Sequence, residues 1–274
     1  MKEPRADPKY LAKARAEIRD WEAAKPGYVS NVTDFVLNSV ERLSSGLIPP
    51  HAQAALEKSV ADALVELQRL AKDSFDPEET RALVKGQKAK GLEGMDLGAQ
   101  YYWNMHLAYA AVEGGATGMA GLAGLAIDVP TLLGLAMRAV HQMGTCYGYD
   151  LHDPLEREYA LQVLRLGSSG NVQVKIKFSV SVNELEAILR ERSWKRLTND
   201  QARRQINRMS LLIALRQFAK TLSLQLLRRK ALQIIPITGA LVGAGFNAQF
   251  LNDVCHAGYM SYRRRKLADL AGPN

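Results

Sequence analysis

Two charged residues, Asp128 and Arg138, lie inside a long apolar and glycine-rich stretch, residues 113–150. Burying a charge in apolar surroundings costs free energy unless the charge is paired. One expectation is therefore a buried ion pair between the two residues, brought together by a bend at Pro130. A second is that Asp128 caps a helix that starts at Pro130. A third is a polar site in which Arg138 and free backbone N–H groups bind a lipid head group or a small anion.

The residues that follow this stretch add three candidate ligands: Tyr147, Asp150 and Asp153. A hydrolase-type enzyme could use them together with Asp128 and Arg138. The same residues also have a purely structural interpretation. Gly148 suits the end of one helix, and Asp153 followed by Pro154 suits the start of the next.

Histidine and cysteine side chains nearby raise the question of a metal ion or a nucleophile. His141, Cys146 and His152 lack the spacing of an HExxH or CxxC site, and Cys255 and His256 are adjacent, so their side chains diverge on a helix. The sequence therefore predicts no metal and no cofactor. A nucleophilic pair of Cys146 with His141 would need a third group, for which the sequence gives no sign.

Glycines recur at short spacing in this stretch and in a second one, residues 234–266. The positions concerned are Gly118, Gly121, Gly124, Gly239 and Gly243. Each glycine inside a helix costs roughly 0.5–1 kcal/mol relative to alanine, so several together need compensation from close packing. We expect the two glycine faces to pack against each other. The alternative is that one or both segments open and enter lipid, although Asp128 and Pro130 disfavour stable spanning.

The two segments together resemble the EcsC family. The first carries Thr117, Gly118, Gly121, Gly124, Asp128, Pro130, Arg138 and the turn Tyr147-Gly148-x-Asp150 followed by Asp153-Pro154. The second carries Ile235-Pro236, Gly239, Gly243, Gly245, Asn247 and Ala257. The resemblance covers roughly residues 59–267. The family is named for a protein encoded beside an ABC transporter concerned with secretion, so the resemblance implies a transport or envelope process and an ABC transporter as one partner. It implies no reaction.

Helical periodicity dominates the chain and predicts an all-α fold, a single helical domain built around the two glycine-rich segments. We expect an N-terminal helical segment over residues 1–58, the EcsC-like domain over 59–267 and a tail over 268–274. Residues 172–182 depart from this pattern, because apolar and polar residues alternate strictly there. The alternation predicts one short β-strand, which would pair with another copy of the chain, or else an amphipathic helix.

The net charge of +8 is concentrated in one region. From residue 184 onward there are sixteen Lys/Arg against six Asp/Glu, and before it twenty against twenty-two. The residues predicted to form a basic face are Arg228, Arg229, Lys230, Arg263, Arg264, Arg265 and Lys266. Such a face suits an anionic membrane or an acidic membrane protein. Nucleic acid is not predicted as a partner, because few stacking aromatic residues accompany the cations.

Two cysteines without a disulfide framework and a charged, polar N-terminal sequence predict a cytoplasmic protein, peripheral on the inner face of the membrane. These observations favour a non-enzymatic accessory protein that binds an anionic lipid surface or a membrane protein. The alternative is a module that binds lipid or a small anion, or a hydrolase-type enzyme, at Asp128, Arg138 and the turn 147–153.

Overall fold

The computed structural model describes residues 7–23, 54–55, 58, 60–62, 75–87, 91–117, 121–168, 183, 186 and 239–271. For residues 113–117, 121–130 and 239–246 it describes the backbone alone. All the elements in these ranges are α-helices, which confirms the predicted all-α class. The predicted strand at 172–182 lies outside the described residues, as do Gly118, Arg228, Arg229 and Lys230.

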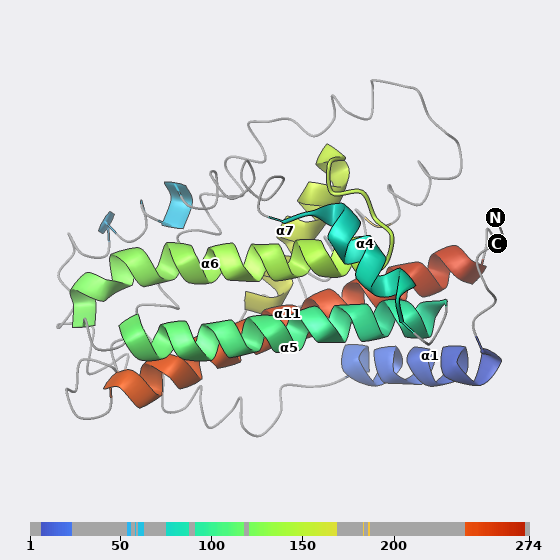
Figure 1. Ribbon diagram of the computed structural model, residues 1–274, viewed down its shortest axis with the longest axis horizontal. Helices are drawn as coiled ribbons and strands as arrows, with labels where there is room; N and C mark the ends of the chain where they lie inside the picture. The colour runs from blue at the N-terminus through green and yellow to red at the C-terminus, as the bar shows by residue number, and fades with distance from the viewer. Residues whose placement is uncertain are drawn as a thin grey trace.

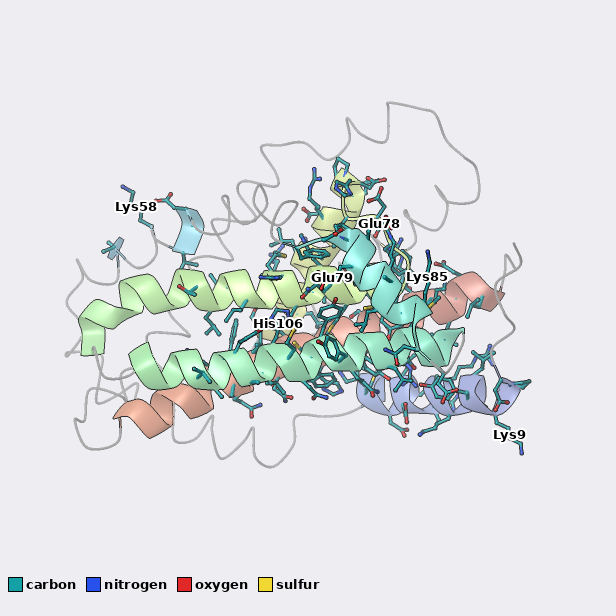
Figure 2. All side chains as sticks on the ribbon, in the orientation of Figure 1. Lys9, Lys58, Glu78, Glu79, Lys85 and His106 are labelled. Atoms are coloured by element: carbon teal, nitrogen blue, oxygen red, sulfur yellow. The ribbon has the colours of Figure 1, made fainter. Side chains whose placement is uncertain are left out.

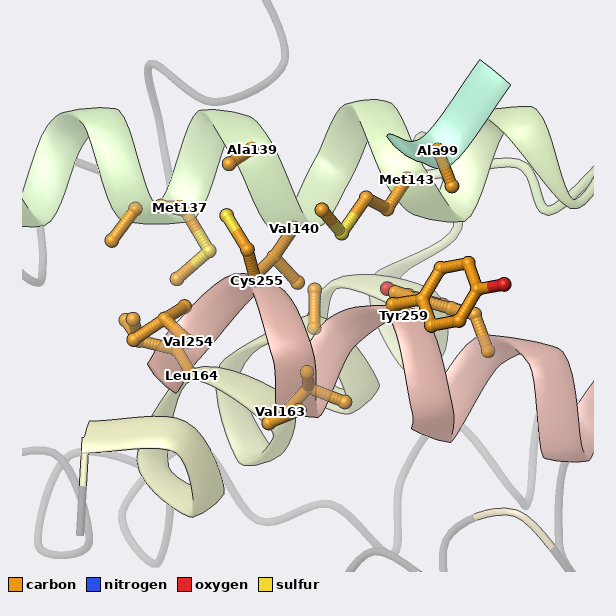
Figure 3. Close-up of a cluster of buried hydrophobic side chains, with 14 of the residues drawn as sticks. Ala99, Met137, Ala139, Val140, Met143, Val163, Leu164, Val254, Cys255 and Tyr259 are labelled. Carbon is orange, nitrogen blue, oxygen red and sulfur yellow. The ribbon is translucent and has the colours of Figure 1, made fainter. Parts of the chain in front are cut away.

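Three long helices form the centre of the fold (Figure 1). α5 (Leu92–Thr117) and α6 (Gly121–Cys146) run antiparallel, and α11 (Gly239–Ala271) lies against both of them. Figure 3 shows their apolar contact, with Val140 of α6 facing Cys255 of α11, and both side chains are fully buried. Burial of such apolar faces, more than intrinsic helix propensity, holds helices of this length in place.

In the described part of the chain, three shorter helices surround this centre. α7 (Pro154–Ser168) packs against α11 and α6, α4 (Pro77–Lys85) lies across α5 and α6, and α1 (Pro8–Ala23) lies along α11. The amphipathic pattern of α1 explains its place, because its buried residues, Ala14 and Ile18, are four positions apart on one face. The segment predicted as N-terminal thus contributes a helix to the same core.

α6 continues without a break through Pro130, where the sequence predicted a bend or a new helix. Asp128 therefore does not cap a helix that begins at Pro130. Ten residues of continuous helix rise about 15 Å, and Asp128 and Arg138 are separated by that length along one axis. The predicted ion pair between them is incompatible with this helix, because Asp and Arg side chains cannot bridge such a rise.

The turn after α6 forms as predicted. Gly148 has a φ angle of +88°, in the left-handed region that favours glycine. Its N–H donates to the carbonyl of Thr145, and the N–H of Tyr149 donates to the carbonyl of Gly144, both at 3.0 Å. These two bonds make a Schellman motif, which ends the helix and satisfies two of its last carbonyl groups.

Asp153 caps the next helix, also as predicted. Its Oδ1 accepts a hydrogen bond from the N–H of Leu155 at 2.9 Å, and Pro154 occupies the first position of α7. We expect Asp153→Ala to lower the free energy of unfolding by about 1 kcal/mol in urea denaturation. Asp153→Asn keeps a capping oxygen and should lose much less. Equal losses for the two variants would contradict a capping role.

Close helix packing at glycine occurs at positions that the sequence did not single out. A Cβ atom added to Gly167 of α7 would lie 2.5 Å from the Cα of Val254 in α11. One added to Gly144 of α6 would lie 2.9 Å from the ring of Tyr262, which is fully buried. The packing around Gly121, Gly124, Gly239 and Gly243 lies outside what the structure describes. Close approach of the helices is thus documented at Gly144 and Gly167 instead.

Candidate functional site

The basic cluster near the end of α11 is largely internal. Arg263 and Arg265 are 1% and 2% exposed, so the prediction that they form part of an exposed basic face is wrong. The reason is the position of α11, which lies against α1, α5, α6 and α7 and so turns these side chains into the protein. Each of the three arginines pairs with carboxylates from other segments.

Arg263 joins a buried network around Asp96 of α5. Its Nε lies 2.8 Å from Asp96, and its Nη1 donates to Glu17 of α1 at 2.5 Å. Asp96 also accepts hydrogen bonds from the hydroxyls of Tyr10 and Tyr147, at 2.6 and 2.7 Å. Burial raises the pKa of Asp96, while Arg263 and the two hydroxyls act in the opposite direction. Tyr147, predicted as a ligand, is therefore engaged inside the protein.

Arg265 forms a bidentate ion pair with Glu156 of α7. Both N–H···O distances are 2.6 Å, and the pair is buried. The guanidinium lies 3.8 Å from the ring centre of Tyr149 and 5.0 Å from that of Tyr159. Two parallel hydrogen bonds and two aromatic faces replace the water that the arginine loses on burial. The pair fixes α11 to α7.

Arg264 is less buried than its neighbours. It donates to Glu22 of α1 at 2.9 Å and to Glu186 at 2.6 Å. Lys266, the last member of the predicted cluster, is half-buried. Arg263, Arg264 and Arg265 thus hold helices together.

The two remaining acids of the predicted turn do not converge on Arg138. Asp150 is exposed, and its Oδ1 accepts the backbone N–H of His152 at 3.0 Å. This backbone hydrogen bond is the main cause that lowers the pKa of Asp150. Asp153 caps α7 as described above. Among the predicted ligands whose side chains are described, Arg138 is the one that lines a large cavity.

That cavity is an open groove of about 950 Å³ between α4, α5 and α6. Phe75, which precedes α4, also lines it. Figure 2 shows His106 between α5 and α6, and Glu79 near the place where α4 crosses α6. The polar residues of the groove are Glu79, His106, Arg138 and Gln142, and the apolar and aromatic ones include Leu83, Tyr101, Met105, Tyr109, Val112 and Leu135. A mostly apolar concave surface with a few convergent polar groups is the usual form of a ligand site.

The groove continues into an exposed apolar edge on α5. Tyr109 is 55% and Val112 is 77% exposed, and the two residues are three positions apart on the same side of the helix. Arg138 is also exposed, and none of the carboxylates that the structure describes lies within ion-pair distance of it. A cation with no ion-pair partner among the described residues therefore faces an aromatic and aliphatic wall across the groove.

His106 is the buried polar group of this site. It is 1% exposed, and its Nε2 lies 2.6 Å from Oε1 of Gln142. An amide oxygen has no proton, so Nε2 carries the proton and donates. Nδ1 then has a free lone pair in the neutral ring, and it has no hydrogen-bond partner within the described structure. Burial lowers the pKa of His106, and the charge of Arg138 lowers it further.

The model of the EcsC protein family matches residues 12–267. The chain belongs to the EcsC family. It is 28% identical over 194 residues to "Uncharacterized protein YdbA" of Bacillus subtilis (strain 168). The aligned residues cover 70% of this chain and 65% of that protein. It is 36% identical over 74 residues to "Protein EcsC" of the same organism, covering 27% of this chain and 31% of that protein.

These matches cover less than two thirds of the length of either relative. No solved structure matches the chain. The confirmed family membership supports the resemblance based on the glycine segments and the turn at Gly148. A bilayer-crossing helix is absent from the parts of this EcsC-family chain that the structure describes.

Sequence reasoning did not identify His106, Gln142 or Glu79 of the groove. His106 and Gln142 are 36 residues apart on facing helices, so no local motif joins them. The one sequence signal near them was the aromatic character of residues 99–113, which includes Tyr101, Tyr102 and Tyr109.

The two cysteines lack the exposure and the low thiol pKa that a nucleophilic cysteine needs. Cys146 and Cys255 are buried free thiols in this EcsC-family chain. Burial raises the pKa of Cys146 to about 12, so the reactive thiolate is disfavoured at neutral pH. In the described ranges, no three His, Cys, Asp or Glu side chains come close enough together to hold a metal ion.

Proposed function

We propose that this EcsC-family protein is a non-enzymatic accessory protein that attaches peripherally to an anionic membrane surface and binds an anionic lipid in the groove between α4, α5 and α6. The observation that carries the proposal is the exposed Arg138 in a groove with an aromatic and apolar wall. Aromatic side chains favour the interface of a bilayer, and cations favour anionic head groups. A role in a transport or envelope process is part of this proposal, through the family resemblance.

The groove replaces the C-terminal basic face as the proposed lipid contact. Arg263, Arg264 and Arg265 are already neutralised by carboxylates from other segments, so they offer little attraction to a membrane. Arg138 has no such partner among the described residues. Tyr109 and Val112 beside it offer apolar surface that lipid chains would cover.

Binding suits this site better than hydrolysis does. A hydrolase needs an acid or base and a nucleophile that converge on one point. Here Asp150 and Asp153 hold the turn, Tyr147 donates to Asp96, and the described cysteines are buried. The polar groups of the groove are a cation, an amide, a buried imidazole and one carboxylate, and no nucleophile is among them. The cation and the amide can hold an acid.

The test is co-sedimentation with vesicles of phosphatidylcholine alone or mixed with phosphatidylglycerol, at low and high salt. We expect binding to the mixed vesicles, and Arg138→Gln should weaken it about fivefold at low salt, because one cation near the surface contributes about 1 kcal/mol. Arg19→Gln is the matched control, since Arg19 is exposed on α1, away from the groove. No binding to mixed vesicles at low salt, or equal weakening by the two variants, would contradict the proposal.

A further inference from the structure

We infer that the groove is a proton-linked site for a single-chain carboxylic acid, whose carboxylate binds beside Arg138, whose chain lies along the apolar wall of α5, and whose binding adds a proton to His106. This inference rests on the proposed function, of which it names the ligand class and the regulation.

The charges in the groove favour a singly ionised head group. Arg138 is the one cation that lines it among the described residues, and the carboxylate of Glu79 lines it as well. A phosphate monoester carries about 1.5 to 2 negative charges at neutral pH and is usually held by several donors or cations. A carboxylate carries one charge, as a phosphate diester does, so either matches a single arginine. The size of the apolar part then decides for the single-chain acid.

The apolar part of the groove suits one hydrocarbon chain. A volume of about 950 Å³ lies at the upper end of sites for small molecules. Leu83 on α4, Met105 on α5 and Leu135 on α6 line it from three sides. Its open edge at Tyr109 and Val112 would let the chain enter from a bilayer.

His106 is placed to respond to the charge of the ligand. It lines the same groove as Arg138, from the facing helix, and its Nδ1 has no partner in the described part of the protein. Gln142 keeps the proton on Nε2, so any added proton goes to Nδ1. Without ligand, burial and the nearby arginine both disfavour that proton, and the pKa of His106 is lowered.

A carboxylate beside Arg138 changes this balance. It offsets the charge of the arginine and adds a negative charge near the imidazole, so the pKa of His106 is higher in the complex than in the free protein. By linkage, affinity for the ionised ligand then falls as pH rises between these two pKa values, by up to tenfold per pH unit.

Other titratable groups of the groove are Glu79 on α4 and Tyr101, Tyr102 and Tyr109 on α5. Burial raises the pKa of Tyr102 above its usual value. The variant Glu79→Gln tests whether the carboxylate of Glu79 contributes to the pH dependence.

The test is calorimetric titration with decanoate between about pH 6 and pH 8, where the carboxyl group of the ligand is ionised and histidine can change its charge. Decanol, which has the same chain without the acid, is the reference ligand. In the unmodified protein, titrations in two buffers of different ionisation enthalpy count the protons taken up. We expect uptake with decanoate and none with decanol. His106→Gln should remove the pH dependence. Glu79→Gln removes the other acid of the groove, and loss of the pH dependence in that variant alone would overturn the inference.

A second measurement uses the unmodified protein, so it does not depend on whether a variant folds. The chain has five histidines, so their ring proton signals can be followed individually in an NMR titration. One histidine pKa should rise when decanoate saturates the protein and stay unchanged with decanol. Decanoate binding without proton uptake would overturn the inference and leave the membrane proposal standing. Vesicle binding without any decanoate binding would likewise overturn it, and loss of both would reject the proposed function as well.

Discussion

Glu156→Gln is expected to lower the free energy of unfolding by about 3–5 kcal/mol, because it leaves the charge of Arg265 buried without a partner. The pair is bidentate, with both distances at 2.6 Å, and both side chains are almost entirely covered. For a protein of this size the loss corresponds to a melting temperature lower by roughly 6–20 °C. Urea denaturation and calorimetry measure the two quantities.

The control for this prediction is an exposed ion pair, Glu78 with Arg81 in α4. Glu78→Gln should change stability by less than about 1 kcal/mol, since water screens that pair. The double variant Glu156→Met with Arg265→Met should be more stable than either single variant, because apolar side chains of similar volume leave no buried charge. Losses that simply add would show that the two residues are not coupled.

Gly167→Ala is expected to be the most damaging single-methyl change in the described core. Its Cβ would lie 2.5 Å from the Cα of Val254 and 2.9 Å from the carbonyl oxygen of Asp253. Both are backbone atoms of α11, so no side chain can rotate away, and α7 must move off α11. Overpacking of this kind costs roughly 1–3 kcal/mol, and more where the backbone cannot relax. Denaturant unfolding measures the loss.

Gly86→Ala is the matched control at the end of α4. Gly86 has φ near −74°, and its nearest contact for a Cβ is at 3.4 Å, with a carbonyl of its own helix. We expect this change to be neutral or to stabilise by about 0.4–1 kcal/mol, through the loss of freedom in the unfolded chain. If Gly167→Ala behaved in the same way, α7 and α11 would not be in the close contact described.

Local sequence signals predicted the parts of the fold that local interactions determine. Gly148 ends α6 and Asp153 with Pro154 starts α7, because a left-handed glycine and a capping carboxylate act within a few residues. Pro130 was a misleading signal. The helix α6 continues through Pro130, although proline removes one helical hydrogen bond.

The environment of the charged residues could not be predicted in the same way. Arg263 and Arg265 form part of a polar run of four cations, which is typical of a solvated face. Their burial depends on Asp96 and Glu156, which lie far away in the sequence on other helices. His106 and Gln142 pose the same difficulty, since only the pairing of α5 with α6 brings them together.

The three adjacent arginines of α11 also set the order in which the protein can be completed during synthesis. Their partners Glu17, Glu22 and Glu156 precede them by 246, 242 and 109 residues. Helical proteins usually fold fast because most of their contacts are local, yet these bonds close very long loops. On a ribosome, α1 emerges before α11, so Glu17 and Glu22 can meet Arg263 and Arg264 only after α11 has been made. Completion of this bundle is therefore a late event, in which one short stretch of chain joins helices that were synthesised long before it.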